Sequence, residues 1–164
     1  MNDLSIGNFN EKEQLNALIK IASLLNRYGF KWSLGASMML KLRGLDVSVD
    51  DLDIIIQTDE IKRLEKIISI YNFKKEVSSD KYRTTHFYEL NIDNVDIDIM
   101  IGFKISTDGS LYTFDDSSST DEIKIQGVTI YLSSLEEWLK AYTAMNRKDK
   151  ISVIENHLNE NSMN

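Results

Sequence analysis

Two pairs of aspartates stand two residues apart, each beside or within an aliphatic run. Asp51 and Asp53 lie at the start of one run, and Asp96 and Asp98 lie within Val95–Ile101. Side chains two apart on a strand point to the same face, so each pair would present two carboxylates together. Carboxylates this close repel one another. A divalent cation such as Mg²⁺ relieves that repulsion, because it takes carboxylate and phosphate oxygens as ligands.

If the two strands are neighbours, three or four carboxylates would converge. Such a set can hold two metal ions, which clamp the attacking and leaving oxygens of a phosphoryl transfer. A second interpretation stays open. Asp-x-Asp also arises by chance in an acidic chain, and each strand would then only show a polar face to water. The protein would in that case be an acidic α/β domain without a metal site.

A glycine turn stands upstream of the first pair, in Leu34-Gly35-Ala36-Ser37. Gly35 would let the chain turn tightly between a strand and a helix. Backbone N–H groups at the start of that helix, together with the Ser37 hydroxyl, would bind an anion such as a phosphate. The alternative is an ordinary strand-to-helix turn in which Ser37 caps the helix.

The hydrophobic periodicity predicts the elements that position these residues. Predicted helices span residues 10–28, 36–42, 59–71, 133–146 and 149–158. Predicted strands span residues 30–34, 52–56, 73–77, 86–91 and 95–101, followed by two short strands within 122–132 that turn at Gln126-Gly127. Residues 107–120 are predicted as a surface loop, interrupted by a short strand at 111–114.

This order predicts an α/β (α+β) fold, a mixed β-sheet flanked by helices in a single domain. The domain would span residues 1–158 with its core at about 30–150, and residues 159–164 would form a frayed polar tail.

The glycine turn, a spacer of thirteen residues and Asp51-Leu52-Asp53 together resemble the nucleotidyltransferase superfamily. That superfamily includes DNA polymerase β, the aminoglycoside and lincosamide nucleotidyltransferases, and the minimal nucleotidyltransferases of toxin–antitoxin systems. Its members carry a third carboxylate on a later strand, which by resemblance is Asp98, with Asp96 as the alternative. The segments Ser134–Leu139 and Met145–Asp149 resemble the closing helices of the small antibiotic-type and antitoxin-associated members.

The resemblance implies a nucleotidyltransferase-like fold over roughly residues 30–150 and a role for each matched residue. It implies transfer of a nucleoside monophosphate from a nucleoside triphosphate to an acceptor hydroxyl or phosphate, with release of pyrophosphate. The implied ligands of Mg²⁺ (or Mn²⁺) are the carboxylates of Asp51, Asp53, Asp96 and Asp98, of which Asp51, Asp53 and Asp98 would be catalytic. The implied contacts to the triphosphate are Gly35, Ala36, Ser37, Arg147 and Lys148.

Two positions depart from the family pattern. Ala36 stands where many members have Gly or Ser, and Tyr142 stands where many have a lysine in the closing helix. The acceptor, a small molecule or a protein, is not fixed by the sequence. A second hypothesis is therefore an antitoxin or binding protein that acts through a toxin partner with little or no catalysis.

The composition excludes or disfavours several classes of partner and of site. With 19 Lys and Arg against 26 Asp and Glu, the formal net charge is −7, which disfavours a polynucleotide partner. The absence of cysteine excludes disulfides and thiolate metal sites. No apolar run is long enough to span a membrane, and the N-terminus shows no export signal, so we expect a cytoplasmic protein.

Overall fold

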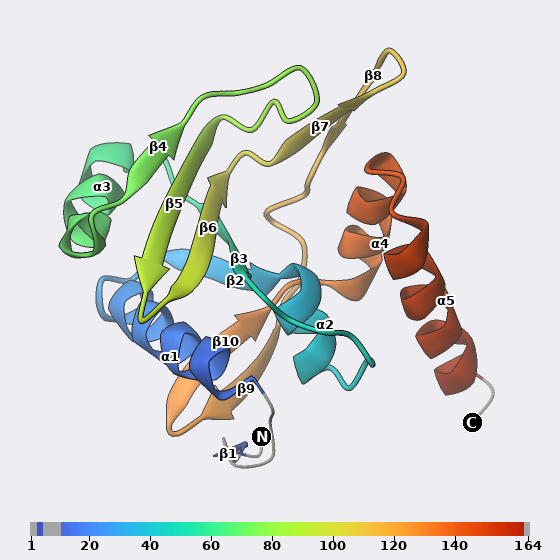
Figure 1. Cartoon of the computed structure of the whole chain (residues 1–164), viewed down its shortest axis with the longest axis horizontal. Helices are drawn as coiled ribbons and strands as arrows, with labels where there is room; N and C mark the ends of the chain where they lie inside the picture. The colour runs from blue at the N-terminus through green and yellow to red at the C-terminus, as the bar shows by residue number, and fades with distance from the viewer. Residues whose placement is uncertain (1–2, 5–10, 163–164) are drawn as a thin grey trace.

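The computed structural model describes residues 3–4 and 11–162, and within them the helices and strands follow the predicted alternation (Figure 1). The helices are α1 (Lys12–Arg27), α2 (Ala36–Leu42), α3 (Ile61–Ile68), the 3₁₀ helix η2 (Ser69–Tyr71), α4 (Leu135–Ala144) and α5 (Lys148–Ser162). The strands are β1 (Asp3–Leu4), β2 (Lys31–Gly35), β3 (Leu52–Gln57), β4 (Lys74–Glu76), β5 (His86–Ile92), β6 (Val95–Ile101), β7 (Lys104–Thr107), β8 (Ser110–Thr113), β9 (Asp121–Ile125) and β10 (Val128–Leu132).

Eight strands form one mixed sheet in the order β1-β9-β10-β2-β3-β6-β5-β4, and β7 pairs with β8 in a separate hairpin. The pairs β3–β6, β10–β2 and β1–β9 are parallel, and the remaining pairs of the large sheet are antiparallel. The predicted mixed sheet in a single domain is therefore confirmed. The turn between β5 and β6 uses Asp93 and Asn94, both with positive φ (52° and 68°), which suits a tight hairpin.

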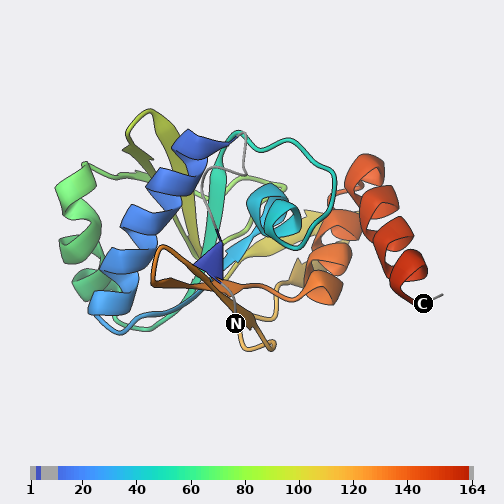
Figure 2. The same cartoon turned by 90° about the horizontal axis from the view of Figure 1, so that it is seen from below.

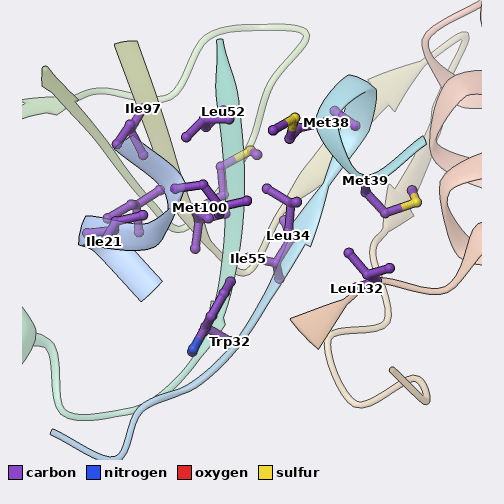
Figure 3. Packing of buried hydrophobic residues seen from close by; sticks show 14 of the residues in the cluster. Ile21, Trp32, Leu34, Met38, Met39, Leu52, Ile55, Ile97, Met100 and Leu132 are labelled. Atoms are coloured by element: carbon purple, nitrogen blue, oxygen red, sulfur yellow. The ribbon is translucent and has the colours of Figure 1, made fainter. Parts of the chain in front are cut away.

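The two faces of the sheet differ in chemistry because each strand alternates. One face carries aliphatic side chains such as Leu52, Ile54 and Ile97, all fully buried, and α1 and α3 cover it (Figure 2). Figure 3 shows Ile21 of α1 packed among these residues. The opposite face carries the carboxylates. The buried face thus holds the sheet rigid while the other face is left free for a site.

The turn from β2 into α2 is fixed by Trp138 of α4. A Cβ atom added at Gly35 would lie 2.1 Å from Trp138 Cζ2, so only glycine lets the indole pack there. The next residue, Ala36, adopts a left-handed φ of 52°, which strains a residue with a Cβ. The sequence alone indicates that Gly35 serves a tight turn. In the structure, the close approach of the Trp138 indole is what requires a glycine at this position.

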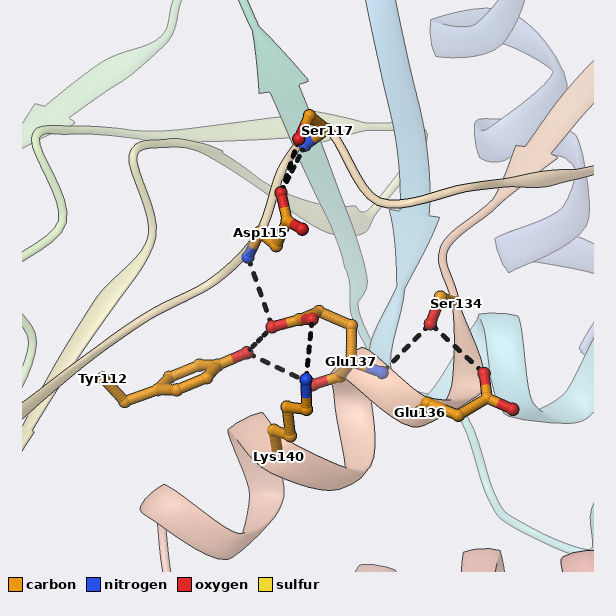
Figure 4. A network of polar contacts seen from close by, with 7 residues as sticks. All are labelled: Tyr112, Asp115, Ser117, Ser134, Glu136, Glu137 and Lys140. Atoms are coloured by element: carbon orange, nitrogen blue, oxygen red, sulfur yellow. Dashed lines mark hydrogen bonds and ion pairs between the residues drawn. The ribbon is translucent and has the colours of Figure 1, made fainter.

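The helix α4 that carries Trp138 is held by its preceding turn and by a buried carboxylate (Figure 4). Ser134 caps the helix by accepting a hydrogen bond from the Glu137 backbone N–H at 3.0 Å. The Glu137 side chain accepts hydrogen bonds from the Tyr112 hydroxyl and, at 3.2 Å, from the Asp115 backbone N–H. These bonds tie the β7–β8 hairpin to α4.

Three predictions of local structure were wrong. Strand β7 lies in a segment that had no predicted strand, because its pairing with β8 is set by the chain reversal rather than by alternation. Helix α5 continues to Ser162, so residues 159–162 of the predicted tail are helical, while 163–164 lie outside the described residues. Strand β1 was not predicted at all. No helix among the described residues is long and apolar enough to cross a membrane.

Opposite substitutions at two adjacent residues should have opposite effects on stability. We expect Gly35→Ala to lower the free energy of unfolding by about 2–3 kcal/mol, because its Cβ would collide with a buried ring. We expect Ala36→Gly to raise it by about 0.5–1 kcal/mol, because it relieves the left-handed strain. Urea denaturation of the two variants and the wild type measures both, and equal effects of the same sign would contradict this account of the turn.

Candidate active site

The sheet register brings Asp53 and Asp98 side by side. Strands β3 and β6 are parallel neighbours, and Asp53 pairs directly with Asp98. Gly35 of β2 pairs with Asp53 from the other side, and Glu89 of β5 pairs with Asp98. Cross-strand partners point to the same face, so these four positions form one row across four strands. The two Asp-x-Asp strands are therefore neighbours, which is the condition under which their carboxylates are expected to converge.

Asp51 and Asp96 lie one step further along the same face. Asp51 sits in the bend before β3 and is exposed, and Asp96 is exposed and accepts a hydrogen bond from Asn91 Nδ2 at 2.9 Å. The described residues contain no group of three His, Cys, Asp or Glu side chains close enough to share one ion. The convergence of three or four carboxylates around bound metal therefore stays a prediction. Repulsion from Asp51 contributes to the raised pKa of both Asp53 and Asp98, so its charge lies close to theirs.

The charges on this face are not neutralised by basic side chains. Across residues 11–162, none of the ion pairs involves Asp51, Asp53, Asp96 or Asp98. Loss of hydration on burial, followed by repulsion from Asp51, raises the pKa of Asp53 to about 7. Burial, followed by repulsion from Asp53 and then Glu89, raises the pKa of Asp98 to about 7. Both groups thus carry an electrostatic penalty when ionised.

A pocket of about 480 Å³ opens over the row. Asp53 and Asp98 lie in its floor, and Ser37 of α2 faces them together with Arg147 and Lys150 from the closing helices. Lys150 Nζ donates a hydrogen bond to Ser37 Oγ at 3.0 Å, joining positions 113 residues apart in the sequence. The pocket therefore combines several hydroxyls and two cationic side chains with four acidic ones, namely Asp53, Asp98, Glu76 and Glu89.

The predicted site residues divide into two groups. The structure places Asp53, Asp98, Ala36, Ser37 and Arg147 in the wall of the pocket. The predicted residues that do not line it are Gly35, Asp51, Asp96 and Lys148.

Lys150 is the basic residue that the sequence analysis missed. It lies three residues after Arg147, so the two side chains lie on the same side of the chain where α5 begins. Lys148 is exposed and does not line the pocket. That spacing was the available signal. Burial and the nearby Arg147 lower the pKa of Lys150.

Tyr142, at the position where many family members have a lysine, also lines the pocket. It is buried, and loss of hydration on burial raises the pKa of its phenol. The lysine that reaches this pocket comes instead from α5. The departure from the family pattern thus does not leave the pocket without a lysine.

The donor set fits a divalent cation. Asp53 and Asp98 offer hard carboxylate oxygens on adjacent strands and have no cationic partner among the described residues. Mg²⁺ is commonly held by one or two carboxylates, with water and substrate phosphates completing its shell. Two adjacent carboxylates therefore suffice, and a preformed cage of three is not required.

The carboxylate pair predicts how the metal-free protein responds to pH. Burial raises the pKa of Asp53 to about 7 in the folded chain from its ordinary value of 3.8, so the folded state binds more protons between these values. Stability should fall as pH rises from about 4 to 7. Asp53→Asn should remove this part of the loss, of order 1–3 kcal/mol. Urea denaturation in the presence of a chelator measures it, and parallel pH curves for wild type and variant would contradict the raised pKa.

No protein-family profile and no curated protein matches the sequence, whereas solved structures match its fold. One is a protein from Thermotoga maritima provisionally assigned as a nucleotidyltransferase. It is 27% identical, with a TM-score of 0.72 over 93% of this chain and 96% of that one.

Two antibiotic-modifying enzymes match at lower identity. ANT(2'')-Ia, solved in complex with adenylyl-2''-tobramycin, is 13% identical with a TM-score of 0.60 over 89% of this chain and 90% of that one. The lincosamide antibiotic adenylyltransferase LnuA, solved with lincomycin bound, is 16% identical with a TM-score of 0.58 over 94% of this chain and 98% of that one. Together with the Gly35, Asp53 and Asp98 row, these matches show that the chain has the nucleotidyltransferase fold.

Proposed function

We propose that this protein is a metal-dependent nucleotidyltransferase that transfers a nucleoside monophosphate from a nucleoside triphosphate to an acceptor hydroxyl or phosphate, releasing pyrophosphate. The observation that carries the proposal is the pocket in which Asp53 and Asp98 face Ser37, Arg147 and Lys150. A carboxylate pair without cationic partners suits a divalent ion, and the basic wall beside it suits a polyphosphate.

Asp53 and Asp98 would hold Mg²⁺ or Mn²⁺, with Asp51 close enough to join them once repulsion is relieved. The bound ion would supply charge neutralisation at the phosphate under attack and at the departing pyrophosphate. Lys150 and Arg147 would bind the non-reacting phosphates. For Arg147 this means releasing its two hydrogen bonds to Asp149, both 3.2 Å long. The Ser37 hydroxyl, which accepts from Lys150, can donate to the same phosphates.

Asp98 would either ligate the ion that lowers the pKa of the acceptor or take the proton of the acceptor itself. Its carboxyl is half-buried and lines the pocket beside Asp53. When Asp98 acts as the base, the hydroxyl proton of the acceptor passes to its carboxylate. The acceptor oxygen then bonds to the phosphorus as the pyrophosphate oxygen leaves.

The far end of the pocket would take the acceptor. It is lined by Val77, Tyr82 and Phe87, with Val77 90% exposed and Tyr82 41% exposed. These side chains suit a molecule with apolar surface.

Thermal unfolding with each of ATP, GTP, CTP and UTP, with and without Mg²⁺, tests the proposal. At about a hundred times its Kd, the preferred nucleotide should add roughly 2.7 kcal/mol, which raises Tm by about 5–10 °C for a domain of this size. The rise should need Mg²⁺ and should disappear in Asp53→Asn, each Tm being compared with that variant's own unliganded value.

Asp50→Asn is the matched control, because it removes an exposed carboxylate next to the row and outside the pocket wall. It should keep the wild-type shift. No shift with any nucleotide would contradict the proposal and favour a binding protein that acts through a protein partner. A shift that Asp53→Asn retains would contradict the assigned metal ligands.

A further inference from the structure

One residue in the wall of the pocket has a buried side-chain polar atom without a hydrogen-bond partner. The atom is Nε1 of Trp138, a residue only 2% exposed. The other side-chain atoms of the described residues that are buried without a partner belong to Glu11, Gln57 and His86, and none of these lines the pocket. A buried donor without an acceptor is costly, so its presence in a ligand pocket calls for an explanation.

The indole nitrogen lies at the head of the carboxylate row. A Cβ built on Gly35 would lie 2.7 Å from Trp138 Nε1, so the nitrogen edge of the indole occupies the place of the missing side chain at position 35. Gly35 pairs directly with Asp53. The N–H therefore stands one strand away from the carboxylates, on the same face of the sheet.

The indole is held in place by other rings rather than by its polar atom. Its ring centroid lies 5.8 Å from Phe103, 5.3 Å from Phe114 and 5.4 Å from Tyr142. Packing alone thus fixes its orientation, and the N–H is not needed for the fold. Ala36 next to it is strained, with a φ of 52°.

The chemistry of the Trp138 indole N–H limits which kind of ligand atom can bind to it. An indole N–H only donates, so the ligand must bring an acceptor oxygen to Gly35. Lys150 and Arg147 line the same pocket, which favours an anionic oxygen over a carbonyl or hydroxyl. We propose that the Trp138 Nε1–H donates a hydrogen bond to a phosphate oxygen of the bound nucleoside triphosphate. The inference rests on the proposed function, and it makes Trp138 a substrate-binding residue.

Trp32 provides the matched control. It is the other tryptophan of the chain, it is 4% exposed, and its Nε1 already donates to Asn26 Oδ1 at 2.8 Å on the opposite face of the sheet. An isosteric replacement of either indole by benzothienylalanine, in which sulfur replaces the N–H, removes one donor and keeps the ring. The two positions should respond in opposite ways.

At position 138 the replacement should leave the unliganded protein at least as stable as the wild type, because it removes an unpartnered buried donor, and weaken its affinity for the preferred nucleotide with Mg²⁺ about 10- to 100-fold. At position 32 it should lower stability and leave the affinity unchanged. Calorimetric titration and urea denaturation of the full chain measure both. Unchanged nucleotide affinity at position 138 would overturn the inference.

The indole ¹⁵N–H resonances give a second readout that needs no change at position 138. Trp32→Phe assigns the two signals, and addition of the nucleotide with Mg²⁺ should move the Trp138 signal downfield while the Trp32 signal stays. A bound nucleotide that leaves the Trp138 signal in place overturns this inference alone. Failure of every nucleotide to bind the wild type overturns the proposed function and the inference together.

Discussion

The parallel pairing of β3 with β6 forces two carboxylates into one place, and the rest of the site depends on it. Asp53 and Asp98 are direct partners in that register, and both lose hydration there, which raises the pKa of each to about 7. An apolar sheet face packed under α1 and α3 makes the register rigid. The strands cannot separate to relieve the repulsion without losing that core, so relief has to come from protons or from a cation.

A second constraint ties the glycine turn to the closing helices. Trp138 lies against Gly35, and its helix is tied to the β7–β8 hairpin by the buried Glu137. Lys150 then reaches Ser37 from α5. The β2–α2 turn, the strands that carry the carboxylate row and the closing helices thus meet at the pocket. A ligand in the pocket would contact all three.

The sequence was sufficient for the features that depend on local alternation. Period-two spacing predicts that Asp96 and Asp98 share a face, and the aliphatic run predicts β6 at Val95–Ile101, as observed. It was not sufficient for contacts made by the fold. The three-residue spacing puts Arg147 and Lys150 on one side of the chain, but nothing in the local pattern around Lys150 or Trp138 shows that α4 and α5 pack on the β2–α2 turn. The predicted strand already left Asp51 just before β3, as observed, whereas the exposure of its side chain is set by how the chain enters the sheet.

The central claim is that Asp53 and Asp98 hold a divalent ion beside a nucleotide. Titration of Mn²⁺ into the protein with the preferred nucleotide, followed by electron paramagnetic resonance of the free ion, tests it most directly. We predict saturable Mn²⁺ binding that is lost in Asp53→Asn and in Asp98→Asn and retained in Asp50→Asn. Equal Mn²⁺ binding by all four proteins would contradict the claim, because the ion would then be held by the nucleotide alone.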